Sequence, residues 1–197
     1  MKNVVVNHLM NSVIKYKDFD EIKLKEIKYG IESFYLTITK TIVIFLAAYL
    51  LGIFKTLVLF MLFYTLLRIN GFGLHAKKSW QCWVGSIIIF LLIPYLCIYM
   101  NISKIIQIII PLICLVFVAK YAPADTEKRP IISSKKRLFH KVMCLITVII
   151  YIFFIFFLQN NYLSNIIFFS ILLETIMILP ISYKIFGLKY NNYKSYL

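Results

Sequence analysis

Six apolar runs constrain the fold of this chain more than any other feature of its sequence. They cover about residues 34–54, 56–69, 83–100, 102–119, 142–158 and 163–183. A helix needs about 20 predominantly apolar residues to cross the hydrocarbon core of a bilayer. Each run therefore predicts a spanning helix, although the second run is short enough for a re-entrant segment. Composition agrees, because 61% of the 197 residues are hydrophobic, whereas roughly half is usual in soluble domains.

The N-terminal residues have a different pattern. Hydrophobic side chains recur at helical spacing between Val6 and Val13, and lysines and asparagines lie between them. Asp20 is a candidate cap for a second helix. Such amphipathic helices suit a membrane surface, and packing against the protein's own loops is the alternative. The sequence thus predicts one polytopic all-α domain over 1–197, with an interfacial amphipathic segment at 1–32, six spans within 34–183 and a tail at 184–197.

The basic residues predict how the chain crosses the membrane. All but two of the 22 Lys and Arg residues lie in the N-terminal region up to Lys40, the second and fourth loops, and the C-terminal tail. The exceptions are Lys55 and Lys104, in the first and third loops. The positive-inside rule then places both termini in the cytoplasm. The net charge of +14 predicts anionic partners, either lipid headgroups or an acidic peptide. Nucleic acid is not expected, because no basic element with interleaved aromatics stands outside the apolar runs.

The stretch from Arg68 to Cys82, RINGFGLHAKKSWQC, carries the most chemistry. It is polar and glycine-containing, and it separates two apolar runs. A cysteine attacks as its thiolate, and an imidazole is the usual base that generates one. His75 and Cys82 are seven residues apart, about 10.5 Å along a straight helix, so we expect a break between them. Ser79 as helix cap would place Cys82 in the first turn, where the helix dipole and Lys77 and Lys78 favour a thiolate.

Other interpretations of the same residues remain open. Cys82 is also a small residue that suits burial, and His75 also fits an ordinary loop histidine. His140 and Cys144 are four residues apart and would share a helix face, but no flexible loop or cap adjoins that thiol. A zinc site from His75, Cys82 and His140 lacks the close ligand spacing of known sites. We therefore expect no metal and no other cofactor.

The motif resembles the active-site region of the AgrB family, the membrane-embedded cysteine endopeptidases of bacterial peptide quorum sensing. The family pattern has an arginine, a short glycine-rich turn, His-Ala and a cysteine seven residues after the histidine; here these are Arg68, Gly73, His75–Ala76 and Cys82. Phe72 stands where members commonly have a second glycine. The segment YAPADTEKRPI, from Tyr121 to Ile131, resembles the family's connection between the fourth and fifth spans.

This resemblance implies a substrate and a reaction. The substrate would be an AgrD-like precursor peptide with an amphipathic leader, a central signal sequence and an acidic tail. Cys82 would attack the junction with the tail, with His75 as base, and a thiol or hydroxyl of the peptide would then close a thiolactone or lactone. The resemblance also implies a bacterial cell membrane and a homodimer.

Further residues are candidates for supporting roles. Asp125 could orient the histidine, as Asn or Asp does in papain-type enzymes, or could be a cap or a salt-bridge partner of Lys128 or Arg129. Ser79 or Gln81 could bind the oxyanion. The candidates for binding an acidic tail, or anionic lipid, are Lys77, Lys78, Lys135, Lys136 and Arg137.

Glu174 supports a different class of function. An ionisable residue within a span is by default a functional hypothesis, and a protonated Glu bonded to a neighbouring helix is the structural alternative. Together with Pro94, Pro111 and Pro180, which we expect to kink their spans, Glu174 would suit a small transporter or exporter of peptides or lipids.

Overall fold

The protein is all-α, as the sequence predicts. The computed structural model describes residues 2–16, 20–75, 79–127 and 130–196. The chain forms two compact units, Met1–Leu50 and Leu51–Leu197, which are described in turn. Within the described ranges, six helices are long and apolar enough to cross a membrane, which confirms the predicted number of spans.

The first unit consists of two helices, α1 (Lys2–Tyr16) and α2 (Glu21–Leu50). The side chain of Asp20 accepts a hydrogen bond from the backbone N–H of Lys23 at 3.0 Å, which is the geometry of a helix N-cap. Helix α2 then continues for 30 residues without a break. The amphipathic residues before position 32 and the first apolar run therefore form one helix, and Gly30 between them lies inside it.

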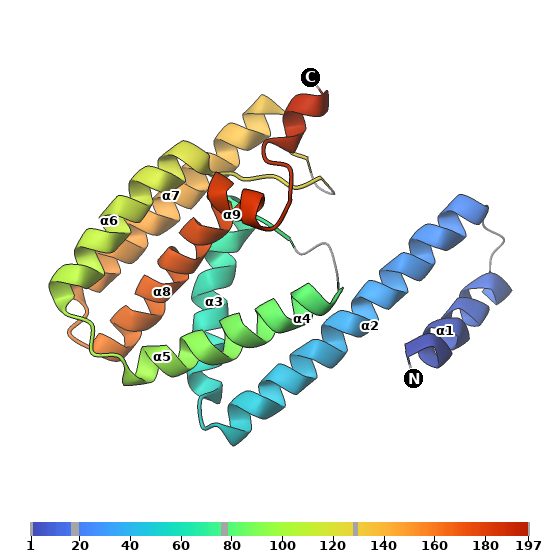
Figure 1. The fold of residues 1–197 in the computed structure, drawn as a ribbon, viewed down its shortest axis with the longest axis horizontal. Coiled ribbons are helices and arrows are strands. Elements are labelled where there is room, and N and C mark those ends of the chain that lie inside the picture. Colours follow the sequence, from blue (N-terminus) through green and yellow to red (C-terminus); the bar gives the residue numbers. More distant parts are fainter. Residues whose placement is uncertain (1, 17–19, 76–78, 128–129, 197) are drawn as a thin grey trace. The chain divides into compact units, whose positions relative to one another are not determined.

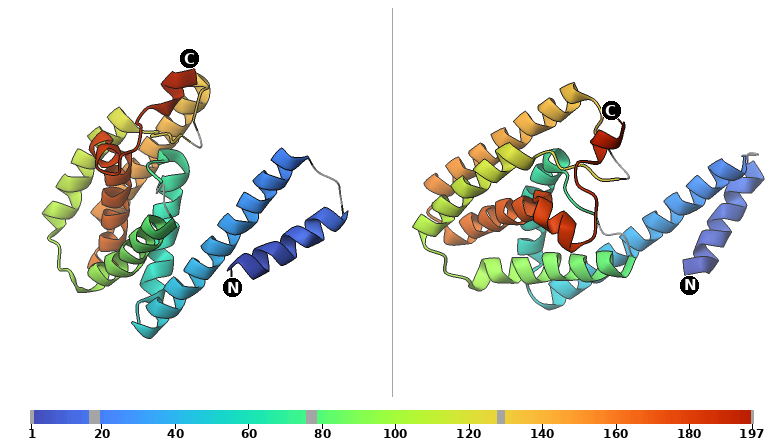
Figure 2. Two further views of the ribbon diagram at one scale, coloured as in Figure 1. Left: turned by 45° about the vertical axis from the view of Figure 1, so that its right-hand side comes forward. Right: turned by 45° about the horizontal axis from the view of Figure 1, so that its top comes forward.

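The second unit is a bundle around helix α8 (Asn161–Ile178). Figures 1 and 2 show α8 beside α3 (Phe54–Gly71), α6 (Lys104–Tyr121) and α7 (Ser134–Phe157). In α8, 61% of the residues of the spanning window are buried, against at most 33% in the other five spans. Helix α3 has 18 residues, about 27 Å at 1.5 Å per residue, which is long enough to cross.

The third span is not a uniform α-helix. It consists of α4 (Ser79–Ile87), a π-helical turn η1 (Ile88–Leu92) and α5 (Ile93–Tyr99). The backbone stays helical through Leu92 and Ile93, so Pro94 lies inside a continuous helix. The π turn is the irregularity that Pro94 predicts, and it ends just before the proline in the chain.

The last apolar run ends earlier than the sequence predicted. Leu179 has φ −66° and ψ 137°, because a residue before proline is pushed out of the helical region. Pro180 then starts a separate short helix, α9 (Pro180–Ile185), which a loop joins to the 3₁₀ helix η2 (Asn192–Tyr196). Pro111 differs from Pro180 because it lies within α6.

Buried polar side chains hold one end of the bundle together. The amide oxygen of Asn165 on α8 accepts from Gln107 on α6 at 2.7 Å. Its nitrogen donates to the carbonyl oxygens of Cys97 and Met100 at 3.0 and 2.8 Å. Such interhelical hydrogen bonds are a common device for joining helices in membranes.

Candidate active site

The loop that follows α3 is pinned by backbone hydrogen bonds. We call its described part, Gly71–His75, the histidine loop. Gly73 N–H donates to the Ala124 carbonyl at 2.7 Å, and Ala124 N–H donates to Gly71 at 3.0 Å. Leu74 N–H donates to the Met177 carbonyl, near the end of α8, at 3.0 Å. The residue just before His75 is therefore held by the central helix.

The glycines of this loop are required by close approaches. A Cβ atom on Gly71 would collide with the Glu174 carboxyl group, and one on Gly73 would collide with the Arg68 guanidinium. Gly73 also has φ +94°, and Phe72 has φ +61°, a region that favours glycine. Phe72 is thus strained at the position where the AgrB pattern commonly has a glycine. Its ring packs edge-on against His140, with centroids 5.0 Å apart.

A buried ion pair lies beneath the loop. Arg68 on α3 and Glu174 on α8 approach to 3.6 Å, and the Glu174 side chain is 1% exposed. The same guanidinium donates from Nη2 to the Leu74 carbonyl at 2.6 Å. Arg68 therefore joins the central helix to the histidine loop. Glu174, which the sequence marked as an intramembrane polar residue, is the partner of a residue of the motif.

His75 and Cys82 lie on either side of residues outside the described ranges. His75 is exposed after the pinned Leu74, and the exposed Cys82 is in the first turn of α4. Helix α4 begins at Ser79 itself, one residue earlier than a cap at Ser79 implies. Gln81 is half-buried in the same turn. Lys77 and Lys78, expected to aid the thiolate, lie outside the described residues.

The other cysteines are unsuited to attack a peptide. Cys97, Cys114 and Cys144 are buried, whereas Cys82 is exposed. In the rival pair, Cys144 is 0% exposed, and His140 Nδ1 lies 3.1 Å from the side-chain oxygen of Asn70. His140 thus contacts Asn70 near the end of α3 and Phe72 in the histidine loop. Within the described ranges, no three His, Cys, Asp or Glu side chains gather as metal ligands.

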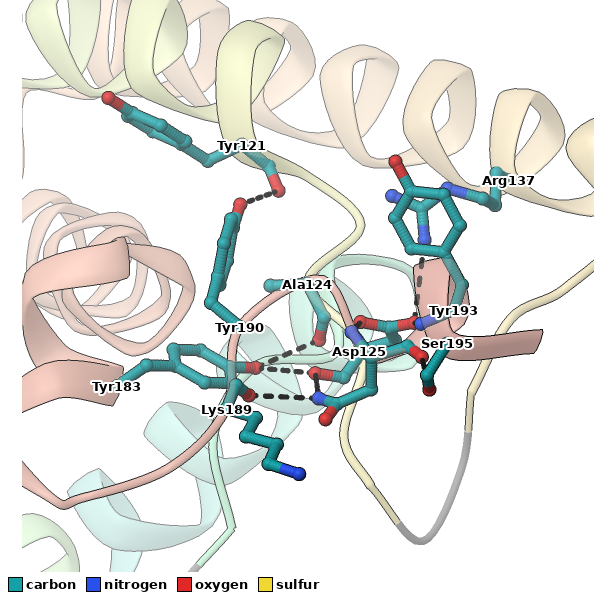
Figure 3. Close-up of polar contacts among 10 residues, drawn as sticks. Tyr121, Ala124, Asp125, Arg137, Tyr183, Lys189, Tyr190, Tyr193 and Ser195 are labelled. Carbon is teal, nitrogen blue, oxygen red and sulfur yellow. Dashed lines mark hydrogen bonds and ion pairs between the residues drawn. The ribbon is translucent and has the colours of Figure 1, made fainter. Parts of the chain in front are cut away.

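Asp125 is the centre of a polar cluster that the sequence analysis missed (Figure 3). Its carboxylate, 1% exposed, accepts from the backbone N–H groups of Asn192 and Tyr193 at 3.0 and 2.8 Å. Arg137 lies 3.6 Å from the same carboxylate. The predicted ion-pair partners Lys128 and Arg129 lie outside the described residues, so Arg137 is the partner seen. The one feature of the sequence that could have indicated a docked tail is the Tyr-Asn-Asn-Tyr run at residues 190–193.

Two tyrosines close this cluster. Tyr183 on α9 donates to the carbonyl oxygens of Ala124 and Asp125 at 3.1 and 3.0 Å, and Tyr190 donates to Tyr121 at 3.2 Å. Burial raises the pKa of Tyr183 above its ordinary value and that of Tyr190 to about 12. Both hydroxyls therefore remain protonated donors at neutral pH.

The predicted basic residues of the fourth loop divide into two kinds. Arg137 is largely buried, and its guanidinium lies 3.6 Å from the ring centroid of Tyr193. Lys135 and Lys136 are exposed in the first turn of α7. Of the three residues, Lys135 and Lys136 are therefore accessible to an anionic partner, and Arg137 is not.

Comparisons with known proteins identify relatives of this chain. The family model described as accessory gene regulator B matches residues 6–178. An AgrB-like protein of Clostridium acetobutylicum is 31% identical over 96% of this chain and 89% of its own length. Accessory gene regulator protein B of Staphylococcus aureus strain Newman is 32% identical over 85% of this chain and 87% of its own length. No solved structure matches the chain. The match includes the histidine loop, Cys82 and Glu174, and the chain belongs to the accessory gene regulator B family.

Proposed function

We propose that this protein is a membrane-embedded cysteine endopeptidase that processes a quorum-sensing propeptide. Membership of the family supports a role in the accessory gene regulator system. The observation that carries the proposal is the contrast among the cysteines: Cys82 is exposed in the first turn of α4, and the other three are buried. The exposed His75, on the pinned loop, is the candidate base.

The reaction needs only groups of the protein and the peptide. His75 takes the proton of the Cys82 thiol, and the sulfur attacks the carbonyl carbon at the junction with the acidic tail. The C–N bond breaks, His75 returns the proton to the leaving amine, and a thioester remains. A thiol or hydroxyl within the peptide then attacks that thioester. The Cys82 thiol is released and the peptide becomes a thiolactone or lactone.

The surroundings of Cys82 suit the first step. The first N–H groups of a helix have no intrahelical partners, and the positive end of the helix dipole stabilises a nearby anion. A thiolate and the oxyanion of a tetrahedral intermediate are both such anions. Ser79 and Gln81 lie in the same turn as Cys82 and are the candidates for added oxyanion donors.

Glu174 does not favour the transporter alternative. That interpretation depended on an intramembrane carboxyl group without an assigned task. The carboxyl group instead pairs with Arg68, which donates to the loop carbonyl of Leu74. On this proposal, the task of Glu174 is to hold Arg68, and through it the histidine loop.

The proposal is tested with Cys82→Ala, Cys144→Ala and His75→Ala. Each is co-expressed with a tagged propeptide that has an amphipathic leader, a central cysteine and an acidic tail. We expect Cys82→Ala and His75→Ala to abolish release of the tail, and Cys144→Ala to retain it. Tail release by a membrane-inserted Cys82→Ala protein would refute the proposal, and loss of release only in Cys144→Ala would identify the rival pair.

The exposed lysines are candidates for binding the acidic tail. Attraction between exposed charges is screened over about 8–10 Å at physiological salt. Lys135→Gln with Lys136→Gln should therefore raise the apparent KM, and added salt should produce the same change in the unaltered protein. Reversing charges in both the lysines and the peptide should restore processing. Normal processing by the doubly substituted protein at every substrate concentration would leave anionic lipid as the partner of these lysines.

A further inference from the structure

The C-terminal segment, Leu188–Tyr196, is docked on one buried carboxylate. Asp125 accepts two backbone hydrogen bonds from it, through Asn192 and Tyr193. The Asn192 side chain also donates to the Asp125 carbonyl at 3.4 Å, and the ring of Tyr193 covers the Arg137 guanidinium. Figure 3 shows the segment and Arg137 meeting at Asp125. A charged acceptor with two N–H donors is a strong anchor.

A short path of hydrogen bonds leads from this anchor to the histidine loop. Asp125 is bonded covalently to Ala124, whose carbonyl oxygen accepts from both Tyr183 and Gly73. Ala124 N–H donates in turn to Gly71. Two residues after Gly73 stands His75. The path therefore joins the C-terminal segment to the backbone that carries the candidate base.

We propose that the C-terminal segment positions His75, acting through Asp125 and Ala124. The proposal rests on the function proposed above. It makes Asp125 a positioning residue whose carboxylate binds the C-terminal segment. The family model ends at residue 178, so the docked segment lies beyond the region that the family pattern describes.

Loss of the segment has a physical consequence for the loop. Without it, Asp125 keeps Arg137 but loses both N–H donors, and a buried carboxylate with empty acceptor positions is costly. Asp125 would then move toward water, and Ala124, which is covalently joined to it, would move as well. Displacement of a catalytic group by about 1 Å is enough to cost roughly a hundredfold in rate.

The experiment combines two changes in the full membrane protein, reconstituted in lipid nanodiscs. One variant ends at Asn191, which removes both donors to Asp125 and keeps Tyr190; one carries Asp125→Asn, and a third has both changes. A variant that ends at Ser195 keeps every contact with Asp125 and is the matched control. Two quantities are measured: hydrogen exchange of a peptide that covers residues 70–75, and the rate at which iodoacetamide alkylates Cys82 at pH 7.

We expect exchange at residues 70–75 to accelerate by about tenfold in each single variant, while α8 keeps its protection. Alkylation of Cys82 should slow by about tenfold, toward the rate of His75→Ala, since the thiolate loses its base. Because both changes cut the same path, the double variant should resemble either single one. The Ser195 control should behave as the unaltered protein.

Two results would overturn the inference. One is unchanged exchange at residues 70–75 in the variant that ends at Asn191. The other is multiplication of the two effects in the double variant, which would mean that Asp125 acts independently of the segment. Failure of the proposed function is distinguishable: His75→Ala would then leave Cys82 alkylation unchanged, while the exchange measurements would still report whether the segment holds the loop.

Discussion

At the scale of single residues, the histidine loop depends on backbone geometry that its sequence only partly favours. Gly73 suits its positive φ, but Phe72 occupies the same region at φ +61°. With ψ −112°, Phe72 lies outside the left-handed helical region, and a side chain in such a sparsely populated conformation costs about 1–3 kcal/mol. The edge-on contact of its ring with His140 is a favourable interaction that offsets part of this cost.

This strain predicts an unusual order of stability for two variants. Phe72→Gly and Phe72→Ala both lose the ring, but only the glycine relieves the strain. We expect the glycine variant to be more stable by about 1 kcal/mol, as measured by unfolding in mixed micelles. At a position with ordinary helix or strand geometry, the alanine variant is usually the more stable of the two. An alanine variant as stable as the glycine variant would show that Phe72 is not strained.

Gly71 and Gly85 provide a matched pair for the close approach of Glu174. A Cβ on Gly71 would meet the Glu174 carboxyl group, whereas nothing lies within 4 Å of a Cβ on Gly85 in α4. Gly71→Ala should destabilise the protein by about 1–3 kcal/mol. Gly85→Ala should be neutral or stabilising. Equal unfolding midpoints for the two variants would contradict the tight packing at Gly71.

At the scale of elements, α3 and α8 are joined by the Arg68–Glu174 pair. Removing one partner of a buried pair typically costs about 3–5 kcal/mol. The two removals differ, because a lone buried carboxylate can take up a proton and a guanidinium cannot lose one. Glu174→Leu should therefore destabilise more than Arg68→Leu. The double variant should cost less than the sum, and additive costs in unfolding experiments would exclude direct coupling.

The sequence was sufficient for the spanning helices and insufficient for their ends. Apolar runs predict membrane helices because a helix that crosses the lipid core must be predominantly apolar. Asp20 could be predicted as a cap because its own side chain makes the capping hydrogen bond. Arg68, Glu174 and Asp125 drew attention as polar residues. Their partners could not be predicted, because an ion pair between residues 106 positions apart depends on how helices pack. The docked C-terminal segment was missed since its bonds are made by backbone N–H groups, which every residue has.

At the scale of the whole molecule, the asymmetry of basic residues predicts the orientation. Lys104 is one of the two basic residues that lie outside the predicted cytoplasmic segments. Its ammonium group donates to the Leu158 carbonyl at 2.6 Å, so its charge has a structural role. In a Cys82→Ala background, we expect an impermeant maleimide added outside cells to label Asn101→Cys and to miss Ser134→Cys. Labelling of Ser134→Cys in intact cells would reverse the orientation and place the candidate site outside.

The docking of residues 188–196 on Asp125 also bears on synthesis of the chain. Residues 188–196 follow the last spanning helix, α8, within a few turns of chain, so both leave the ribosome only when translation ends. On the proposal above, His75 therefore gains its final support after release of the chain, when α8 has joined the bundle and the segment reaches Asp125. A released chain that ended before residue 188 would then be an inserted protein that cleaves its peptide slowly, and protein abundance alone would overstate the activity in the membrane.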